Sequence, residues 1–101
     1  MNPKLDLDPA TLARFCEQHY VRSLSLFGSQ LKGTAGPNSD IDLLVEFKPN
    51  ARITLLDMAG MEIELSLALG GRKVDLRTAQ ELSRYFRDEV VRSAEVQYVA
   101  G

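Results

Sequence analysis

The chemically most suggestive feature of the sequence is a pair of aspartates, Asp40 and Asp42, separated by one apolar residue. The apolar run that contains them, residues 40–47, predicts a β-strand. Side chains alternate along a strand, so both carboxylates should point to one face while Ile41 and Leu43 point to the other. Two carboxylates on one anchored strand can hold divalent metal ions.

A glycine and a serine, Gly28 and Ser29, precede this pair in the chain. Gly28 has no side chain, so its N–H can approach a triphosphate closely, and the Ser29 hydroxyl can add a hydrogen bond. A glycine–serine pair alone is ordinary turn chemistry and predicts little. Followed by Asp40 and Asp42, it suggests a nucleoside triphosphate held on magnesium.

Asp75 is the candidate for a third carboxylate. It lies in residues 72–77, which predict a short strand, and its apolar neighbours Val74 and Leu76 should enter the opposite face. The sequence leaves open whether Asp75 shares a face with Asp42. An alternative is an exposed charge pattern, because Lys73 and Arg77 flank it.

Three acids of this kind suit nucleotidyl transfer. An acceptor hydroxyl, the α-phosphorus and the departing pyrophosphate must be nearly in line, and two magnesium ions can activate the attacking oxygen and stabilise the leaving one. Magnesium prefers oxygen ligands in octahedral geometry, which carboxylates, phosphates and water provide.

The stretch from Gly28 to Val45 resembles the signature of the DNA polymerase beta-like nucleotidyltransferase superfamily, in which glycine-serine is followed by Asp-x-Asp. In this short form it looks like the minimal nucleotidyltransferase family, and the resemblance covers nearly the whole chain. It implies that Asp40, Asp42 and Asp75 are catalytic metal ligands, that Gly28 and Ser29 bind nucleotide, and that ATP and two Mg²⁺ ions take part. One departure is Leu31-Lys32, where the family commonly has a small residue and arginine; lysine lacks the planar arginine fork.

The resemblance also implies a partner. Such proteins typically pair with a helical HEPN (higher eukaryotes and prokaryotes nucleotide-binding) RNase toxin and act as its antitoxin by transferring AMP to a toxin tyrosine. Three alternatives remain at this stage: an antitoxin that only masks its partner, a transferase for a small hydroxyl-bearing acceptor, and an RNA-tailing or tRNA-modifying enzyme.

The predicted elements make an α/β fold of the α+β type, a mixed sheet flanked by helices. We expect a helix beginning near Pro9 with Asp8 or Asp6 as its cap, a strand over residues 21–27, and a helix over residues 53–69 that stops at Gly70 and Gly71. Thr78 and Glu81 form a capping-box pattern that should open a last helical region through Val91. Residues 95–101 fit either a strand or an extension.

Composition limits the remaining possibilities. The chain has 101 residues, 45% of them apolar, which predicts a single domain over residues 1–101. Its net charge of −2 offers no general attraction to nucleic acid or to a membrane. One cysteine and the lack of a long apolar run favour a soluble, unexported protein of the cytoplasm. The chain has no room for a second lobe that would hold a base or an acceptor, which fits an enzyme working in a homo- or hetero-oligomer.

Overall fold

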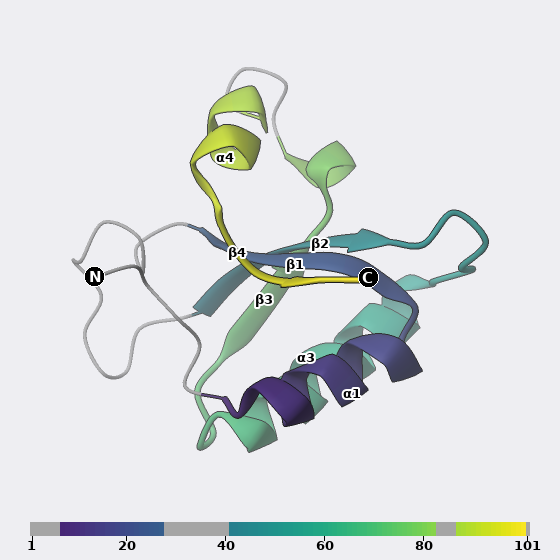
Figure 1. Cartoon of the computed structure of the whole chain (residues 1–101), viewed down its shortest axis with the longest axis vertical. Coiled ribbons are helices and arrows are strands. Elements are labelled where there is room, and N and C mark those ends of the chain that lie inside the picture. Colours follow the sequence, from purple (N-terminus) through teal and green to yellow (C-terminus); the bar gives the residue numbers. More distant parts are fainter. Residues whose placement is uncertain (1–6, 28–40, 83–86, 101) are drawn as a thin grey trace.

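The computed structural model describes residues 7–27, 41–82 and 87–100. In chain order its elements are α1 (Pro9–Gln18), β1 (Val21–Phe27), β2 (Ile41–Phe47), α3 (Leu55–Ala68), β3 (Val74–Arg77), the 3-10 helix η1 (Ala79–Glu81), α4 (Arg87–Ser93) and β4 (Glu95–Val99) (Figure 1). The predicted strands over residues 21–27 and 40–47 are therefore confirmed within the part of the chain described, and the strand predicted over residues 72–77 is present from Val74. The tail forms a strand rather than an extension.

The four strands form one sheet in the order β3-β2-β1-β4. β1 is antiparallel to both β2 and β4, whereas β2 and β3 run parallel. The parallel pair is joined by α3, as a parallel connection requires. This arrangement confirms the mixed sheet and the α+β class expected from the sequence.

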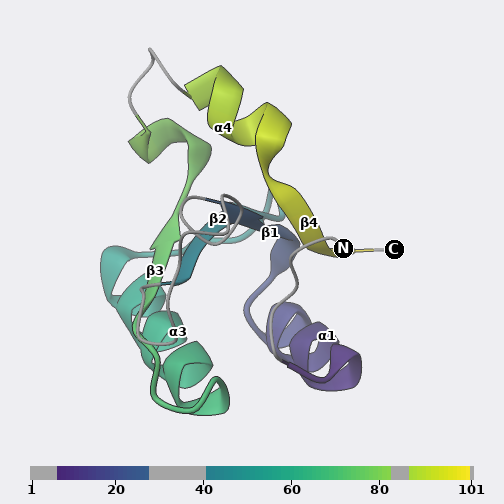
Figure 2. The ribbon, with the colours of Figure 1, turned by 90° about the vertical axis from the view of Figure 1, so that its left-hand side faces the viewer.

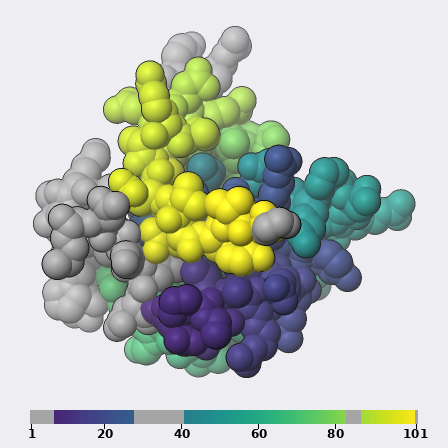
Figure 3. All heavy atoms as spheres, viewed as in Figure 1, coloured from purple at the N-terminus to yellow at the C-terminus, as the bar shows by residue number. Residues whose placement is uncertain are grey.

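Helices α1 and α3 lie side by side on one face of the sheet, and α4 lies on the other side (Figure 2). The core fills the space between the sheet and the first two helices. It is built from alternating strand residues such as Leu24, Leu26 and Leu43 and from helix residues such as Phe15 and Met61. Figure 3 shows β4 in yellow lying directly along the purple and blue α1, where Tyr98 packs against the core.

The helix ends follow the local sequence. The Asp8 carboxylate accepts the Thr11 N–H at 3.3 Å and caps α1, with Pro9 in the first turn. Thr54 and Asp57 form a reciprocal capping box at the start of α3. At the other end, Gly70 and Gly71 have φ of 76° and 89°, a backbone conformation that favours glycine. The expected glycine stop of this helix is confirmed.

The helical region predicted from Thr78 through Val91 is present only in part: η1 and α4 are helical, but Leu82 between them is not. The Thr78 N–H does meet the Glu81 carboxylate at 3.4 Å, but the helix that it opens is the three-residue η1. Leu82 then takes an extended backbone with ψ of 148°, which ends the helical turn. α4 is a separate helix that begins at Arg87.

Over the described residues, none of the helices combines the length and apolar character needed to cross a bilayer.

Candidate active site

Asp42 and Asp75 are direct register partners on the parallel strands β2 and β3. Neighbouring strands in a sheet lie about 4.8 Å apart, and paired residues project to the same face. The question that the sequence left open therefore has an answer: the two carboxylates share a face. Both side chains are half-buried.

The residues on either side of the two aspartates anchor them. Ile41 and Leu43 around Asp42 are buried, as are Val74 and Leu76 around Asp75. These apolar side chains point toward α1 and α3, so the carboxylates must point to the opposite face. The alternation predicted from the sequence is present in both strands, and it fixes the direction of the acids.

β1 supplies the next neighbour on this face. Phe27, the last residue of β1, is the register partner of Asp42 on its other side. Phe27 also directly precedes Gly28 in the sequence. The three-strand row of Phe27, Asp42 and Asp75 was not predicted, because register between strands cannot be read from one strand alone.

Asp40, Gly28, Ser29 and Lys32 lie outside the described residues. Their predicted roles as metal ligand and nucleotide contacts stay predictions. Within the ranges that the structure describes, no group of three or more histidine, cysteine or acidic side chains is placed to hold a metal ion. Asp42 and Asp75 thus form a two-carboxylate arrangement in this part of the chain.

The donor chemistry of this pair suits magnesium. Asp42 and Asp75 offer carboxylate oxygens, the ligand type that a hard divalent cation prefers. The softer ligands of the described chain lie elsewhere: Cys16 and His19 belong to α1 and its end, on the opposite face of the sheet. Burial raises the pKa of the Cys16 thiol to about 12, with a smaller contribution from Glu17, so this residue is a core residue rather than a ligand.

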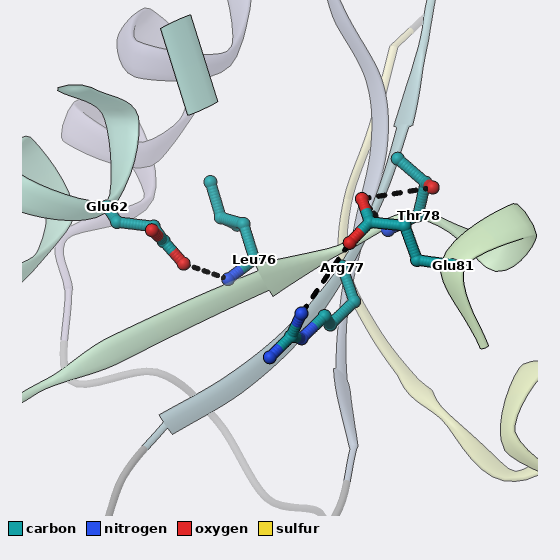
Figure 4. A network of polar contacts seen from close by, with 5 residues as sticks. All are labelled: Glu62, Leu76, Arg77, Thr78 and Glu81. Atoms are coloured by element: carbon teal, nitrogen blue, oxygen red, sulfur yellow. Dashed lines mark hydrogen bonds and ion pairs between the residues drawn. The ribbon is translucent and has the colours of Figure 1, made fainter. Parts of the chain in front are cut away.

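Glu62 of α3 is hydrogen-bonded to the backbone of β3 next to Asp75. Its carboxylate Oε2 accepts the Leu76 backbone N–H at 2.7 Å (Figure 4). Glu62 is therefore not a freely solvated surface charge. The signal was present in the spacing, because Met58, Glu62 and Leu65 recur at four and three residues and so share the inward side of the helix.

A small hollow of about 220 Å³ lies at this edge of the sheet, lined by Asp75, Glu62, Arg77, Glu81 and residues of α3. Arg77 and Glu81 form an exposed ion pair with Nη1 and Oε2 3.6 Å apart, also visible in Figure 4. Charged side chains therefore line one side of Asp75. The backbone next to Asp75 is held by the hydrogen bond from the Leu76 N–H to Glu62.

A mixed sheet with two helices on one face and register-paired carboxylates on the other defines a class of fold and site compatible with nucleotidyl transfer. The nucleotidyltransferase domain family model matches residues 10–99. The chain belongs to this family and is a nucleotidyltransferase.

Named relatives support the same family, and solved structures share the fold. The protein adenylyltransferase MntA of Thermococcus cleftensis is 37% identical over 83 residues, which are 82% of this chain and 79% of that protein. A Methanocaldococcus jannaschii protein named as the protein adenylyltransferase MJ0435 is 34% identical over 77 residues, covering 76% of this chain and 80% of its own length.

A structure described as a minimal nucleotidyltransferase is 34% identical and has a TM-score of 0.62, covering 93% of this chain and 98% of that one. A toxin–antitoxin crystal structure with AMP-PNP has a TM-score of 0.72 at 23% identity, covering 93% and 75%, and shows likeness of fold. The resemblance inferred from Gly28 to Val45 is confirmed.

Proposed function

We propose that this chain is a magnesium-dependent protein adenylyltransferase that transfers AMP from ATP to a tyrosine hydroxyl of a helical HEPN RNase toxin. In this role it acts in the cytoplasm as the antitoxin of that partner, with residues 1–101 as one catalytic domain. The observation that carries the proposal is the register pairing of Asp42 with Asp75 on one sheet face. The names of the relatives, protein adenylyltransferase and MntA, support the same acceptor class.

The reaction balances without any further reactant. The tyrosine oxygen attacks the α-phosphorus of ATP, a new oxygen–phosphorus bond forms, and the bond from the α-phosphorus to the oxygen bridging to the β-phosphate breaks. Pyrophosphate leaves with its electron pair, and the hydroxyl proton passes to solvent. The products are an adenylylated tyrosine and pyrophosphate.

Asp40, Asp42 and Asp75 are the proposed holders of two magnesium ions, with Gly28 and Ser29 as the proposed triphosphate contacts. Bound magnesium supplies charge neutralisation of the triphosphate and lowers the pKa of a coordinated hydroxyl. The protein's own contribution is rigidity, since Asp42 and Asp75 project from strands whose flanking residues are buried in the core. Carboxylates held in this way need no rearrangement before reaction.

The test is the intact mass of the protein encoded beside this chain after incubation with the chain, ATP and magnesium. An Asp42→Asn variant removes one paired carboxylate. Glu46→Gln is the matched control, because Glu46 lies on the same strand and the same face as Asp42 but is an exposed residue paired with Arg22.

The expected result is one added adenylyl group with wild type and Glu46→Gln, and a loss of at least about 100-fold in rate with Asp42→Asn. Tight binding without added mass would replace the proposal with a masking antitoxin. Adenylylation of a small hydroxyl compound in the absence of any protein would favour the small-acceptor alternative.

A further inference from the structure

The outer side of α3 carries an apolar stripe far from the aspartates. Leu56, Ile63 and Leu67 are 82%, 63% and 76% exposed, although each is a large aliphatic side chain. With Gly60 they are spaced at four, three and four residues, which places them on one side of a helix with 3.6 residues per turn. This is the spacing by which one helix packs against another.

Gly60 is the centre of this stripe and has no evident use inside the chain. It lies in the middle of α3, where glycine weakens a helix relative to alanine. A Cβ built at this position meets nothing within 4 Å, so packing within the chain does not require glycine there. A missing side chain at the centre of an exposed apolar stripe allows the backbone of another helix to approach closely.

The stripe continues at its N-terminal end into a hollow with a volume of about 1070 Å³. Leu56 and Gly60 line this hollow together with Tyr20, Ile53 and Met61. A bulky side chain from a docked helix could fill it. The hollow lies at the end of β2 that is opposite to Asp42, since Lys48 and Pro49 also line it.

The charges of α3 itself favour a different protein over a second copy. All charged residues of this helix are acidic, namely Asp57, Glu62 and Glu64. Asp57 and Glu64 border the same side of the stripe, and Glu64 reaches His19 of the α1 end at 2.7 Å. In a symmetric pair of copies the same patch faces itself, so these acids would oppose their own counterparts. A helix with basic flanks fits the stripe better.

We propose that the stripe Leu56, Gly60, Ile63 and Leu67 is the docking surface for one helix of the partner toxin, with apolar residues at three- and four-residue spacing and lysine or arginine beside them. The identity of that partner rests on the proposed function. The surface itself is separate from Asp42 and Asp75, so partner binding and AMP transfer can be measured and can fail independently.

The test is titration calorimetry of the full chain with the protein encoded beside it, without ATP. Ile63→Ser and Gly60→Ala each change the stripe. Val99→Ser is the matched control, because Val99 is 60% exposed on β4, away from α3. We expect Ile63→Ser and Gly60→Ala to weaken binding at least tenfold, and Val99→Ser to leave it unchanged.

Gly60→Ala distinguishes a damaged docking surface from a folding defect. It should keep or raise the Tm of the chain alone while it weakens the complex, which a folding defect cannot do. Glu64→Lys should weaken binding more strongly at low salt than at high salt, because it reverses a charge beside the stripe. Unchanged binding by both stripe variants, or no binding by wild type, would overturn the proposal.

A dimer of the wild-type chain alone that Ile63→Ser dissociates would also overturn it, in favour of a second copy. If the proposed function failed but the stripe were right, the partner would bind through α3 and gain no adenylyl mass. If only the stripe were wrong, the partner would gain that mass with wild type and with both stripe variants at equal rates.

Discussion

The Glu62 carboxylate and the Leu76 backbone N–H are 2.7 Å apart and join α3 to the outer edge of β3. β3 is an edge strand of four residues that pairs only with β2 in the described sheet. The exposed edge of a sheet presents backbone N–H groups that have no strand partner, and the Glu62 carboxylate accepts a hydrogen bond from one of these groups. The peptide that Glu62 holds is the one that follows Asp75, so this contact stabilises the strand on which the carboxylate is mounted.

Removing this contact should affect both stability and catalysis. Glu62→Ala leaves the partly buried Leu76 N–H without its acceptor, and we expect a loss of about 1–3 kcal/mol in the free energy of unfolding. We also expect a higher magnesium concentration for half-maximal transfer, because Asp75 is less firmly held. Urea unfolding and magnesium titration of the adenylylation rate measure the two effects.

Glu64→Ala is the control for this prediction. Glu64 lies on the same helix two residues further on, and its contact is an ion pair with His19 that is largely exposed. Such pairs contribute about 0–1 kcal/mol. Equal magnesium dependence in the two variants would show that Glu62 has no special relation to Asp75.

Asp57 should make the stability of α3 dependent on pH. Hydrogen bonds from the Thr54 backbone N–H and hydroxyl lower the pKa of the Asp57 carboxyl, because they stabilise its charged form. The folded pKa is below the unfolded value of 3.8, so the stabilisation is fully present above that value and is lost as pH falls through the folded pKa. Asp57→Asn should therefore have a lower Tm than wild type at pH 7, and the difference should shrink below about pH 3.8. A constant difference across pH would contradict this assignment.

Much of the fold was predictable because its signals are local. The strand of Asp42, the caps at Asp8 and Thr54, and the stop at Gly70 depend on residue types within a few positions. The candidate site was predictable to the same extent. The alternation of apolar and acidic residues around Asp42 and Asp75 was enough to predict that each carboxylate points away from the apolar face of its own strand.

The relations between elements were not predictable from one sequence. The pairing of Asp42 with Asp75 depends on the register of two strands that are separated by a whole helix. The Thr78 capping box was recognised, yet the helix ends three residues later, because Leu82 adopts an extended backbone that the pattern around Thr78 does not specify. The contact of Glu62 could not be predicted either, because its partner is a backbone group on a distant strand.

Leu43 links the site to the core and should tolerate little change. It directly follows Asp42 on β2 and is fully buried, and its register partner Leu26 on β1 is also buried. Leu43→Ala should lower the free energy of unfolding by about 2–5 kcal/mol through lost burial and the cavity left behind. Leu44→Ala, on the half-buried opposite side, is the comparison in urea unfolding, and a loss as large as that of Leu43→Ala would contradict the assigned faces.

Cys16 should behave as an inert core residue. It has 0% exposure, and burial holds the thiol pKa at about 12, so little thiolate forms at ordinary pH. We expect Ellman's reagent at pH 8 to modify the folded chain at least 100-fold more slowly than the chain in denaturant, with a rate set by unfolding. Prompt reaction in native buffer would show that α1 separates readily from the sheet.

Asp42 and Asp75 should act as one unit in ligand binding. If both hold the same magnesium–nucleotide complex, removing either carboxylate disrupts the site, and removing the second adds little. Magnesium with a non-transferable ATP analogue should raise the Tm of wild type, because the ligand binds only the folded chain. Asp42→Asn, Asp75→Asn and the double variant should each lose most of that increase, while Glu46→Gln keeps it. If the losses of the two single variants add up to the loss of the double variant, the two carboxylates act independently rather than in a shared site. The pairing of β2 with β3 would then have no catalytic meaning.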